Sequence, residues 1–239
     1  MKKSLYIWWE WVDTGKYLDV VFPFNWEKVW SVAIAWKQEV EKAIVLANES
    51  FEETKKLEPV ERVSVLKFIV KKLEERFEEF SETLVLENGK TINEARWEMT
   101  RCIDTYENAI WEEERIYWEA YDLWVTQSAK WRFGVIKKFP VWVVAWITPF
   151  NFPMNLLAHK VAPAIATWCP IIIKPASATP LSTLMLAEII EESGYPKKAF
   201  SVLPCNRVVG QQLVEDDRIA LLSFTWSPSV WWKMKSQAW

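Results

Sequence analysis

The chain has 239 residues, a formal net charge of −3 and 51% hydrophobic residues. This composition excludes a disordered tail, a collagen-like polymer and a disulfide-stapled miniprotein. It also gives no reason to expect a nucleic-acid partner, because the chain has no excess of Lys and Arg to neutralise a nucleic-acid backbone. One count is abnormal. The chain has 18 Trp and only 5 Gly, whereas the usual glycine share of ~7% predicts about 17 Gly.

In the first half of the chain, the residue pattern predicts short strands followed by amphipathic helices. The predicted strands are 5–7, 17–22 and 29–33. Apolar residues at helical spacing predict helices over 37–48 and 92–117. Between them, one apolar stripe that begins after Pro59 and reaches Phe80 predicts a longer helix. Asn88-Gly89 is typical of a helix end. The acidic runs on these helices favour solvated faces rather than a pair of catalytic carboxylates.

The pattern changes near residue 133, where short apolar strands begin to alternate with helices. The predicted strands are 134–139, 141–147, 170–174, 200–203 and 220–224. The predicted helices are 149–166, 180–192, 208–214 and 225–238. This alternation predicts a parallel α/β sheet. Ligands of such sheets bind beyond the carboxyl ends of the strands, which here are 148–151, 174–177 and 225–227.

Several residue types argue against other classes of protein. The three cysteines form no CxxC pair, and their number is odd, so neither a zinc site nor a disulfide framework is indicated. The single histidine, His159, can build no histidine metal cluster and is interpreted as a structural helix residue. Residues 139–158 carry no charge, but their three prolines favour a buried strand and a turn over a membrane span. We find no signal-peptide pattern and expect a soluble, cytoplasmic protein without a membrane partner.

Four motifs follow one another in a characteristic order. They are Ile147-Thr-Pro-Phe-Asn-Phe-Pro153, Ile173-Lys-Pro-Ala-Ser177, Gly194-Tyr-Pro196 and Ser223-Phe-Thr-Trp-Ser227. In order and spacing they resemble the NAD(P)-dependent aldehyde dehydrogenase superfamily. The stretch from Leu5 to Val12 is also similar to the N-terminal strand pair of that family. The resemblance covers the whole chain but only about the first half of a family chain.

This resemblance implies an α/β fold of the aldehyde dehydrogenase type, truncated, with a partial Rossmann-type parallel sheet behind a mainly helical N-terminal segment. Residues 1–132 are expected to form that segment, including strand pairs, helices and the start of an oligomerisation arm. Residues 133–239 are expected to form a partial dinucleotide-binding domain, and the catalytic domain is expected to be absent. The full-length form is expected to be a homodimer or homotetramer.

The resemblance also assigns roles to individual residues. Asn151 matches the asparagine that donates to the aldehyde oxygen as it becomes negative, although its spacing also fits a helix cap. Lys174 matches the lysine on the adenosine ribose; without the motif, a lysine reaching out of a buried strand is the better interpretation. Ser177 replaces the glutamate of many NAD-preferring relatives, so both NAD and NADP are candidate cofactors.

The other candidate residues for cofactor binding come from the same motifs. Ser227 is expected to contact the pyrophosphate at a helix N-terminus, and Gly210 matches a glycine near the adenine pocket. The remaining candidates are Ile147, Thr148, Pro149, Phe150, Trp226 and Trp231.

The resemblance implies oxidation of a small-molecule aldehyde to the carboxylic acid with NAD(P)⁺, through a cysteine thioester. In the family, the nucleophilic cysteine and the general-base glutamate lie beyond the Phe-Thr-Gly-Ser motif, and here Trp239 is the last residue. We therefore expect an N-terminal fragment that is inactive alone. The alternative is a non-catalytic nucleotide-binding or assembly fragment. A reading frame that continues past codon 239 to a cysteine would favour the enzyme.

The tryptophan excess follows the glycines of the family. The matching positions are Trp8, Trp9, Trp142, Trp146, Trp168, Trp226 and Trp231. Further plausible glycine sites are Trp26, Trp30, Trp36, Trp97, Trp111, Trp118, Trp124, Trp131 and Trp239. Some bacteria read UGA as glycine, and a translation table that reads UGA as tryptophan gives this pattern. Our hypothesis is that only Trp11 is original, with Trp232 undecided. The alternative is a Trp-rich chain whose exposed indoles bind sugars or membrane interfaces.

Overall fold

A six-stranded sheet forms the centre of the computed structural model, which describes residues 2–116, 118–225 and 227–238. Four strands are parallel, in the order β11, β8, β9 and β10, and β2 and β3 follow β10 in antiparallel orientation. Their bounds are β2 Leu5–Ile7, β3 Glu10–Val12, β8 Val144–Ile147, β9 Ile171–Lys174, β10 Phe200–Val202 and β11 Leu221–Phe224. The predicted parallel α/β fold is confirmed.

Register along the parallel strands brings their carboxyl ends together. Ile147 pairs with Lys174 on one side and with Phe224 on the other, so β8, β9 and β11 end at one level. Strands β8 and β9 are mostly apolar, because side chains on both faces of a parallel sheet are buried. Because these strands end at a common level, the loops that follow them lie at one edge of the sheet.

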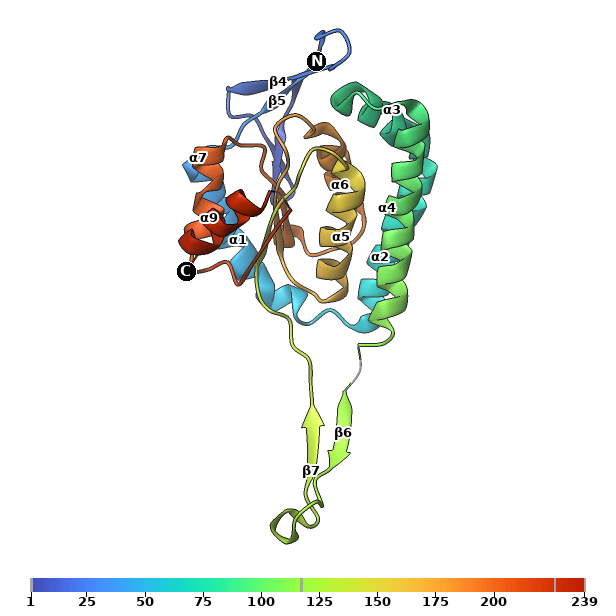
Figure 1. The fold of residues 1–239 in the computed structure, drawn as a ribbon, viewed down its shortest axis with the longest axis vertical. Helices are drawn as coiled ribbons and strands as arrows, with labels where there is room; N and C mark the ends of the chain where they lie inside the picture. The colour runs from blue at the N-terminus through green and yellow to red at the C-terminus, as the bar shows by residue number, and fades with distance from the viewer. Residues whose placement is uncertain (1, 117, 226, 239) are drawn as a thin grey trace.

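Helices cover both faces of the sheet (Figure 1). One face packs against α5 Pro153–Ala166 and α6 Leu181–Glu192, behind which lie α2 Pro59–Glu75, α3 Phe77–Asn88 and α4 Ile92–Glu113. The other face packs against α1 Lys37–Thr54, α7 Arg207–Gly210 and α8 Gln212–Glu215. Each face of the sheet thus has its own hydrophobic core, and alternate residues of β9 contribute to both. Ile171 and Ile173 lie in the core on the α5 and α6 side, and Ile172 lies in the core on the α1 side.

Two smaller sheets lie outside this body. Strands β1 Lys2–Lys3, β5 Lys28–Ala33 and β4 Tyr17–Val21 form the first. Strands β6 Glu119–Asp122 and β7 Phe133–Ile136 form an antiparallel hairpin that extends far from the rest of the molecule (Figure 1). Short 3₁₀ turns occupy Gln127–Ala129 and Lys197–Ala199, and the last helix is α9 Pro228–Gln237.

Several predicted elements differ in extent from those observed. The apolar stripe after Pro59 belongs to two helices, because the chain breaks at Arg76 (φ −105°, ψ 19°) while Leu73 and Phe80 on either side are both buried. The helix predicted over 92–117 ends at Glu113. The strand predicted over 134–139 is β7 alone, and its polar partner β6 has no apolar run that sequence analysis could detect.

The uncharged stretch 139–158 splits into strand β8, a loop and the start of α5. Within the described residues, no helix is both long enough and apolar enough to cross a membrane.

Candidate functional site

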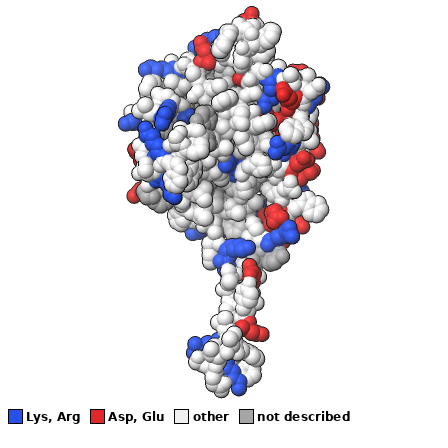
Figure 2. Space-filling model, viewed as in Figure 1, with Lys and Arg blue, Asp and Glu red and all other residues white. Residues whose placement is uncertain are grey.

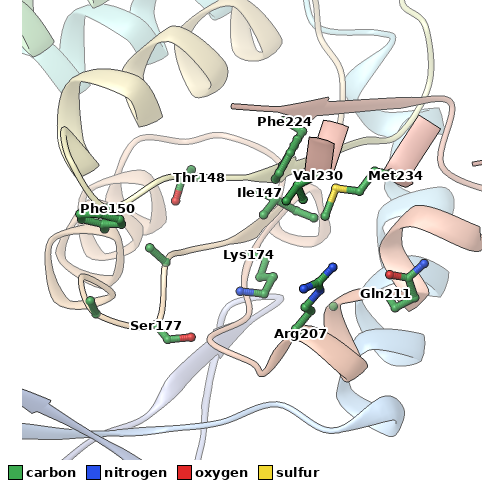
Figure 3. A pocket seen from close by; sticks show the side chains of 13 residues that line it. Ile147, Thr148, Phe150, Lys174, Ser177, Arg207, Gln211, Phe224, Val230 and Met234 are labelled. Atoms are coloured by element: carbon green, nitrogen blue, oxygen red, sulfur yellow. The ribbon is translucent and has the colours of Figure 1, made fainter. Parts of the chain in front are cut away.

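A cavity of about 380 Å³ lies at the carboxyl ends of β8, β9 and β11, where α7 and α9 close its other side (Figure 3). Six residues expected at the site line it: Ile147, Thr148, Phe150, Lys174, Ser177 and Gly210. Sequence reasoning missed other lining residues, of which the main ones are Arg207, Gln211, Phe224, Val230 and Met234. Phe224, Val230 and Met234 make one wall apolar, while the opposite side carries polar and cationic groups.

Lys174 ends strand β9 and points into the cavity (Figure 3). The residue is only 9% exposed, and burial lowers the pKa of its ammonium group, because desolvation disfavours the charged form. Its Nζ donates to the backbone oxygen of Pro175 at 3.3 Å. No described carboxylate forms an ion pair with it. A buried ammonium group with one weak backbone acceptor is suited to bind an additional oxygen ligand.

Gly210 makes room for this lysine. A Cβ at position 210 would stand 2.8 Å from Cδ and 2.9 Å from Cε of Lys174, closer than real side chains approach. Gly210 is the last residue of α7, and it lines the cavity beside Lys174. Here glycine is needed for a close approach between a helix backbone and a side chain, not for a positive φ.

Arg207 adds a second cation to the same cavity. It is the first residue of α7, which Asn206 caps through a hydrogen bond from the Val209 N–H at 2.9 Å. Figure 3 shows the guanidinium beside Lys174. No described carboxylate forms an ion pair with Arg207, and no Asp or Glu lines the cavity. No sequence signal pointed to Arg207, because the strand ends expected to bind a ligand were 148–151, 174–177 and 225–227.

These cations belong to a wider charge asymmetry. On the face shown in Figure 2, Lys and Arg prevail on the side of α7 and α9, and Asp and Glu gather mainly along the helices on the opposite side. A cavity with two unpaired cations on a basic side of the molecule favours an anionic ligand.

Asn151 lies next to the cavity rather than in its lining. It is exposed in the loop between β8 and α5, directly after the lining residue Phe150. Its backbone oxygen accepts a hydrogen bond from Lys90 Nζ at 3.1 Å, which holds the loop to the turn between α3 and α4. Asn151 does not cap α5: the N-cap residue of that helix is Phe152, whose side chain makes no capping hydrogen bond. Pro149 is buried and does not line the cavity.

The motif Ser223-Phe-Thr-Trp-Ser227 and the nearby Trp231 lie only partly at the cavity. Ser227 precedes α9 in an extended conformation, and its hydroxyl is 3.3 Å from that of Ser229. Trp231 lies in α9 against Trp232 and lines a neighbouring depression with Phe224 and Met234, not the main cavity. Trp226 lies outside the described residues.

None of the three cysteines is placed to act as a nucleophile. All are free and buried. Burial raises the pKa of the Cys205 thiol to about 11, and it raises the pKa values of Cys102 and Cys169 as well. Reactive cysteines have lowered pKa values, so these thiols stay protonated. His159 is exposed on α5, and no group of three or more potential metal ligands occurs in the part of the chain that the structure describes.

Comparisons with known proteins agree with this geometry. The profile of the aldehyde dehydrogenase family matches residues 9–238. A 3-sulfolactaldehyde dehydrogenase from Priestia aryabhattai is 36% identical over 236 residues, which are 98% of this chain and 49% of that protein. The structure of aldehyde dehydrogenase 21 from Physcomitrella patens, in complex with the reaction product succinate, matches with a TM-score of 0.97 and 40% identity, over 99% of this chain and 50% of that one.

A further match is the NADP-dependent glyceraldehyde-3-phosphate dehydrogenase from Bacillus halodurans C-125, complexed with NADP. Its TM-score is 0.95 at 27% identity, over 100% of this chain and 51% of that chain. The present chain thus spans about half the length of the relatives it matches. Because the family profile covers nearly every residue and the fold agrees along the whole chain, the resemblance found in the motifs is confirmed, and the chain belongs to the aldehyde dehydrogenase family.

Proposed function

We propose that this chain is the dinucleotide-binding half of an enzyme that oxidises an aldehyde to a carboxylic acid with NAD(P)⁺. The cavity with two unpaired cations, Lys174 and Arg207, at the carboxyl ends of parallel strands carries the proposal. Lys174 would donate to the ribose hydroxyls. Gly210 supports this role by leaving room for the lysine side chain. When bound, the nicotinamide ring supplies a hydride acceptor.

Within this proposal, the cofactor is NADP in preference to NAD. Ser177 is neutral and lines the cavity with Arg207. An arginine near the ribose 2′ position can bind a 2′-phosphate, whereas an acidic residue there favours the free hydroxyl. The related glyceraldehyde-3-phosphate dehydrogenase is NADP-dependent. The apolar wall formed by Phe224, Val230 and Met234 would contact the adenine. Ser227, at the N-terminus of α9, would donate to the pyrophosphate.

Asn151 is the proposed catalytic residue of this half. Its side-chain N–H would donate to the aldehyde oxygen as negative charge develops there, a type of contact worth about 3 kcal/mol in the transition state. The nucleophilic cysteine and the general base would come from the other half of a longer protein, because Cys102, Cys169 and Cys205 are buried with raised thiol pKa values. The three free thiols also favour a reducing, cytoplasmic location.

The hairpin β6–β7 supports an assembly role for the end of residues 1–132 together with β7, which lies just beyond them. Its exposed apolar side chains include Leu123, Trp124, Val125, Phe133 and Val135, and most of its surface is uncharged (Figure 2). An isolated two-stranded hairpin is marginally stable in water. We therefore propose that the hairpin pairs with a second copy of the protein in a homodimer or homotetramer, while residues 133–239 supply most of the cofactor site.

Expression of the gene beyond codon 239 tests the enzymatic proposal. The longer protein should oxidise aldehydes such as 3-sulfolactaldehyde or succinate semialdehyde, with NADPH formation read at 340 nm. A protein of these 239 residues alone should bind NADP and oxidise nothing, because it lacks an activated thiolate. A stop codon after Trp239, or a longer protein that binds NADP without oxidising any aldehyde, would instead favour a non-catalytic nucleotide-binding or assembly fragment.

We also propose that most tryptophans stand where the natural protein has glycine. Among the described residues, every non-glycine residue with positive φ is a tryptophan: Trp8, Trp9, Trp26, Trp131, Trp142 and Trp168. Their φ angles run from 47° to 95°, a region that glycine adopts readily and bulky residues avoid. Membrane or sugar binding by exposed indoles would not explain this backbone geometry.

The contacts of two other tryptophans agree with the distinction between positions of natural glycine and an original tryptophan. Trp146 is buried in β8, and its Nε1–H has no hydrogen-bond partner, which costs about 1–3 kcal/mol. Trp11 instead donates to Glu191 at 3.2 Å and packs edge-on against Tyr6 with ring centroids 5.0 Å apart. The coding DNA tests the proposal: UGA is expected at the positive-φ positions and UGG at Trp11. Peptide mass spectrometry of the natural protein should find glycine at the former, and UGG at every position would contradict the idea.

A further inference from the structure

The helix that follows Asn151 takes its N-terminal cap from a distant part of the chain. Helix α5 begins at Pro153, and Phe152 before it offers no capping side chain. Instead, Oε1 of Glu98 on α4 accepts hydrogen bonds from the backbone N–H groups of Met154 at 2.8 Å and Asn155 at 3.1 Å. The first N–H groups of a helix need such acceptors, and the helix dipole favours a negative charge there.

The same carboxylate is held by a lysine that also holds the loop. Glu98 is fully buried, and its Oε2 accepts a hydrogen bond from Lys90 Nζ, whose side chain is 8% exposed. Lys90 Nζ also donates to the backbone oxygen of Asn151 at 3.1 Å and lies 4.8 Å from the ring centroid of Phe152. A buried charge pair of this kind is stable only while all its partners stay in place.

A second donor from the same turn fixes the neighbouring peptide. Nδ2 of Asn88 donates to the backbone oxygen of Phe150 at 2.6 Å. The turn between α3 and α4 therefore binds two consecutive carbonyl groups, those of Phe150 and Asn151, while Glu98 binds two N–H groups just beyond them. The segment 150–155 is fixed on both sides of Asn151.

We propose that the Lys90–Glu98 pair is a positioning unit that fixes the Asn151 backbone for the reaction; this rests on the proposed function of Asn151. The hydrogen bonds of the pair to the loop and to α5 all go to backbone atoms, and Lys90 also packs over the Phe152 ring. Displacing a reacting group by about 1 Å can cost about 100-fold in rate. Loss of the pair should therefore change turnover more than cofactor binding.

A purely stabilising cap is the competing explanation, and the chain contains a matched example of one. Glu87, also buried, accepts hydrogen bonds from the Leu181 N–H at 2.7 Å and from the Ser182 N–H at 3.3 Å, at the start of α6. Its hydrogen bonds among the described residues go to Leu181 and Ser182, not to residues 151–155. Glu87→Gln should thus reproduce the loss of a buried helix cap without the loss of a contact to the Asn151 loop.

The first experiment follows amide hydrogen exchange by mass spectrometry in the full-length protein and needs no catalysis. Glu98→Gln places an NH₂ group against the Lys90 ammonium, and we expect exchange in 150–157 to accelerate by about tenfold or more. Glu87→Gln should accelerate exchange near 180–184 and leave 150–157 unchanged. The double variant Lys90→Met/Glu98→Gln, which leaves no isolated buried charge, should behave as Glu98→Gln does. Unchanged exchange in 150–157 in both variants would overturn the proposal.

The second experiment is a double-mutant cycle on kcat. Glu98→Gln should lower kcat between about 10- and 100-fold with little change in the KM for NADP, and Glu87→Gln should not. In an Asn151→Ala background, Glu98→Gln should lower kcat no further, because the residue it positions is already gone. An equal loss in both backgrounds would overturn the positioning role. If the unmutated full-length protein oxidises no aldehyde, the proposed function fails, and the exchange experiment alone decides the positioning.

Discussion

Gly210 and Lys174 lie so close that a single added carbon at position 210 would stand 2.8 Å from Cδ of the lysine. The two residues come from different elements, α7 and β9, and their contact forms the floor of the cavity. The far end of a lysine side chain can move at low cost. A larger residue at 210 would therefore redirect the ammonium group rather than unfold the protein.

Gly210→Ala should thus weaken NADP and NAD binding to a similar degree, by about tenfold, because one charge-assisted hydrogen bond to the ribose is lost. Isothermal titration calorimetry measures the affinity of each variant for both cofactors. Gly134→Ala is the matched control, since a Cβ there would lie 3.5 Å from the nearest atom of Leu123, an ordinary contact in the hairpin. Equal cofactor affinities for Gly210→Ala and the unmutated protein would show that the lysine does not bind the cofactor.

Arg207 and Ser177 should decide between the two cofactors. Arg207→Ala should lower the affinity for NADP by about 10- to 100-fold and affect NAD little, because only NADP carries the 2′-phosphate. Ser177→Glu should reverse the preference toward NAD by repelling that phosphate. Arg115→Ala removes an exposed arginine that pairs with Glu112, away from the cavity, and should change neither affinity. A strong NAD preference in the unmutated protein would contradict this assignment.

The sequence predicted the strand ends well because β8 and β9 are continuous apolar runs with a polar residue directly after them. Lys174 could be placed from this pattern alone. Arg207 could not, because its position depends on how α7 packs across the sheet. The acidic runs on the N-terminal helices are expected on solvated faces, and for Glu98 this expectation is wrong: the residue is fully buried, and Lys90 and two helix N–H groups compensate its charge. The periodicity of apolar residues predicts which face of a helix is exposed, but it does not predict partners from distant parts of the chain.

Replacing tryptophans of positive φ by glycine should stabilise the fold. Trp26 has φ 62°, is 76% exposed and takes part in no ring contact among the described residues. Trp26→Gly should therefore raise the free energy of unfolding by about 1–2 kcal/mol, the cost of a left-handed conformation in a residue with a Cβ. Trp11→Gly should lower it, because Trp11 loses its contacts with Glu191 and Tyr6. Urea unfolding measures both, and a destabilising Trp26→Gly would argue that this indole is native.

Glu87 should make stability depend on pH. Burial raises its pKa to about 7, and the charge of Glu98 acts in the same direction, despite the hydrogen bonds from Leu181 and Ser182 that favour the charged form. A carboxyl group whose pKa is raised on folding stabilises the protein fully below its unfolded pKa of about 4.3 and loses that contribution as pH rises to about 7. The loss is on the order of 3 kcal/mol for a fully buried group.

The free energy of unfolding should accordingly fall between pH 5 and pH 7.5 in the unmutated protein. His159 acts in the opposite sense, because partial desolvation of its exposed ring and the charges of Arg101 and Lys160 lower its pKa, so its neutral form is favoured in the folded state. The difference in the free energy of unfolding between the unmutated protein and Glu87→Gln cancels the contribution of His159 and leaves that of Glu87. Urea unfolding at half-unit pH steps should give a difference that shrinks as pH rises. A difference that stays constant across this range would mean that Glu87 is already ionised at pH 5, with the α6 N-terminus stabilising its charge.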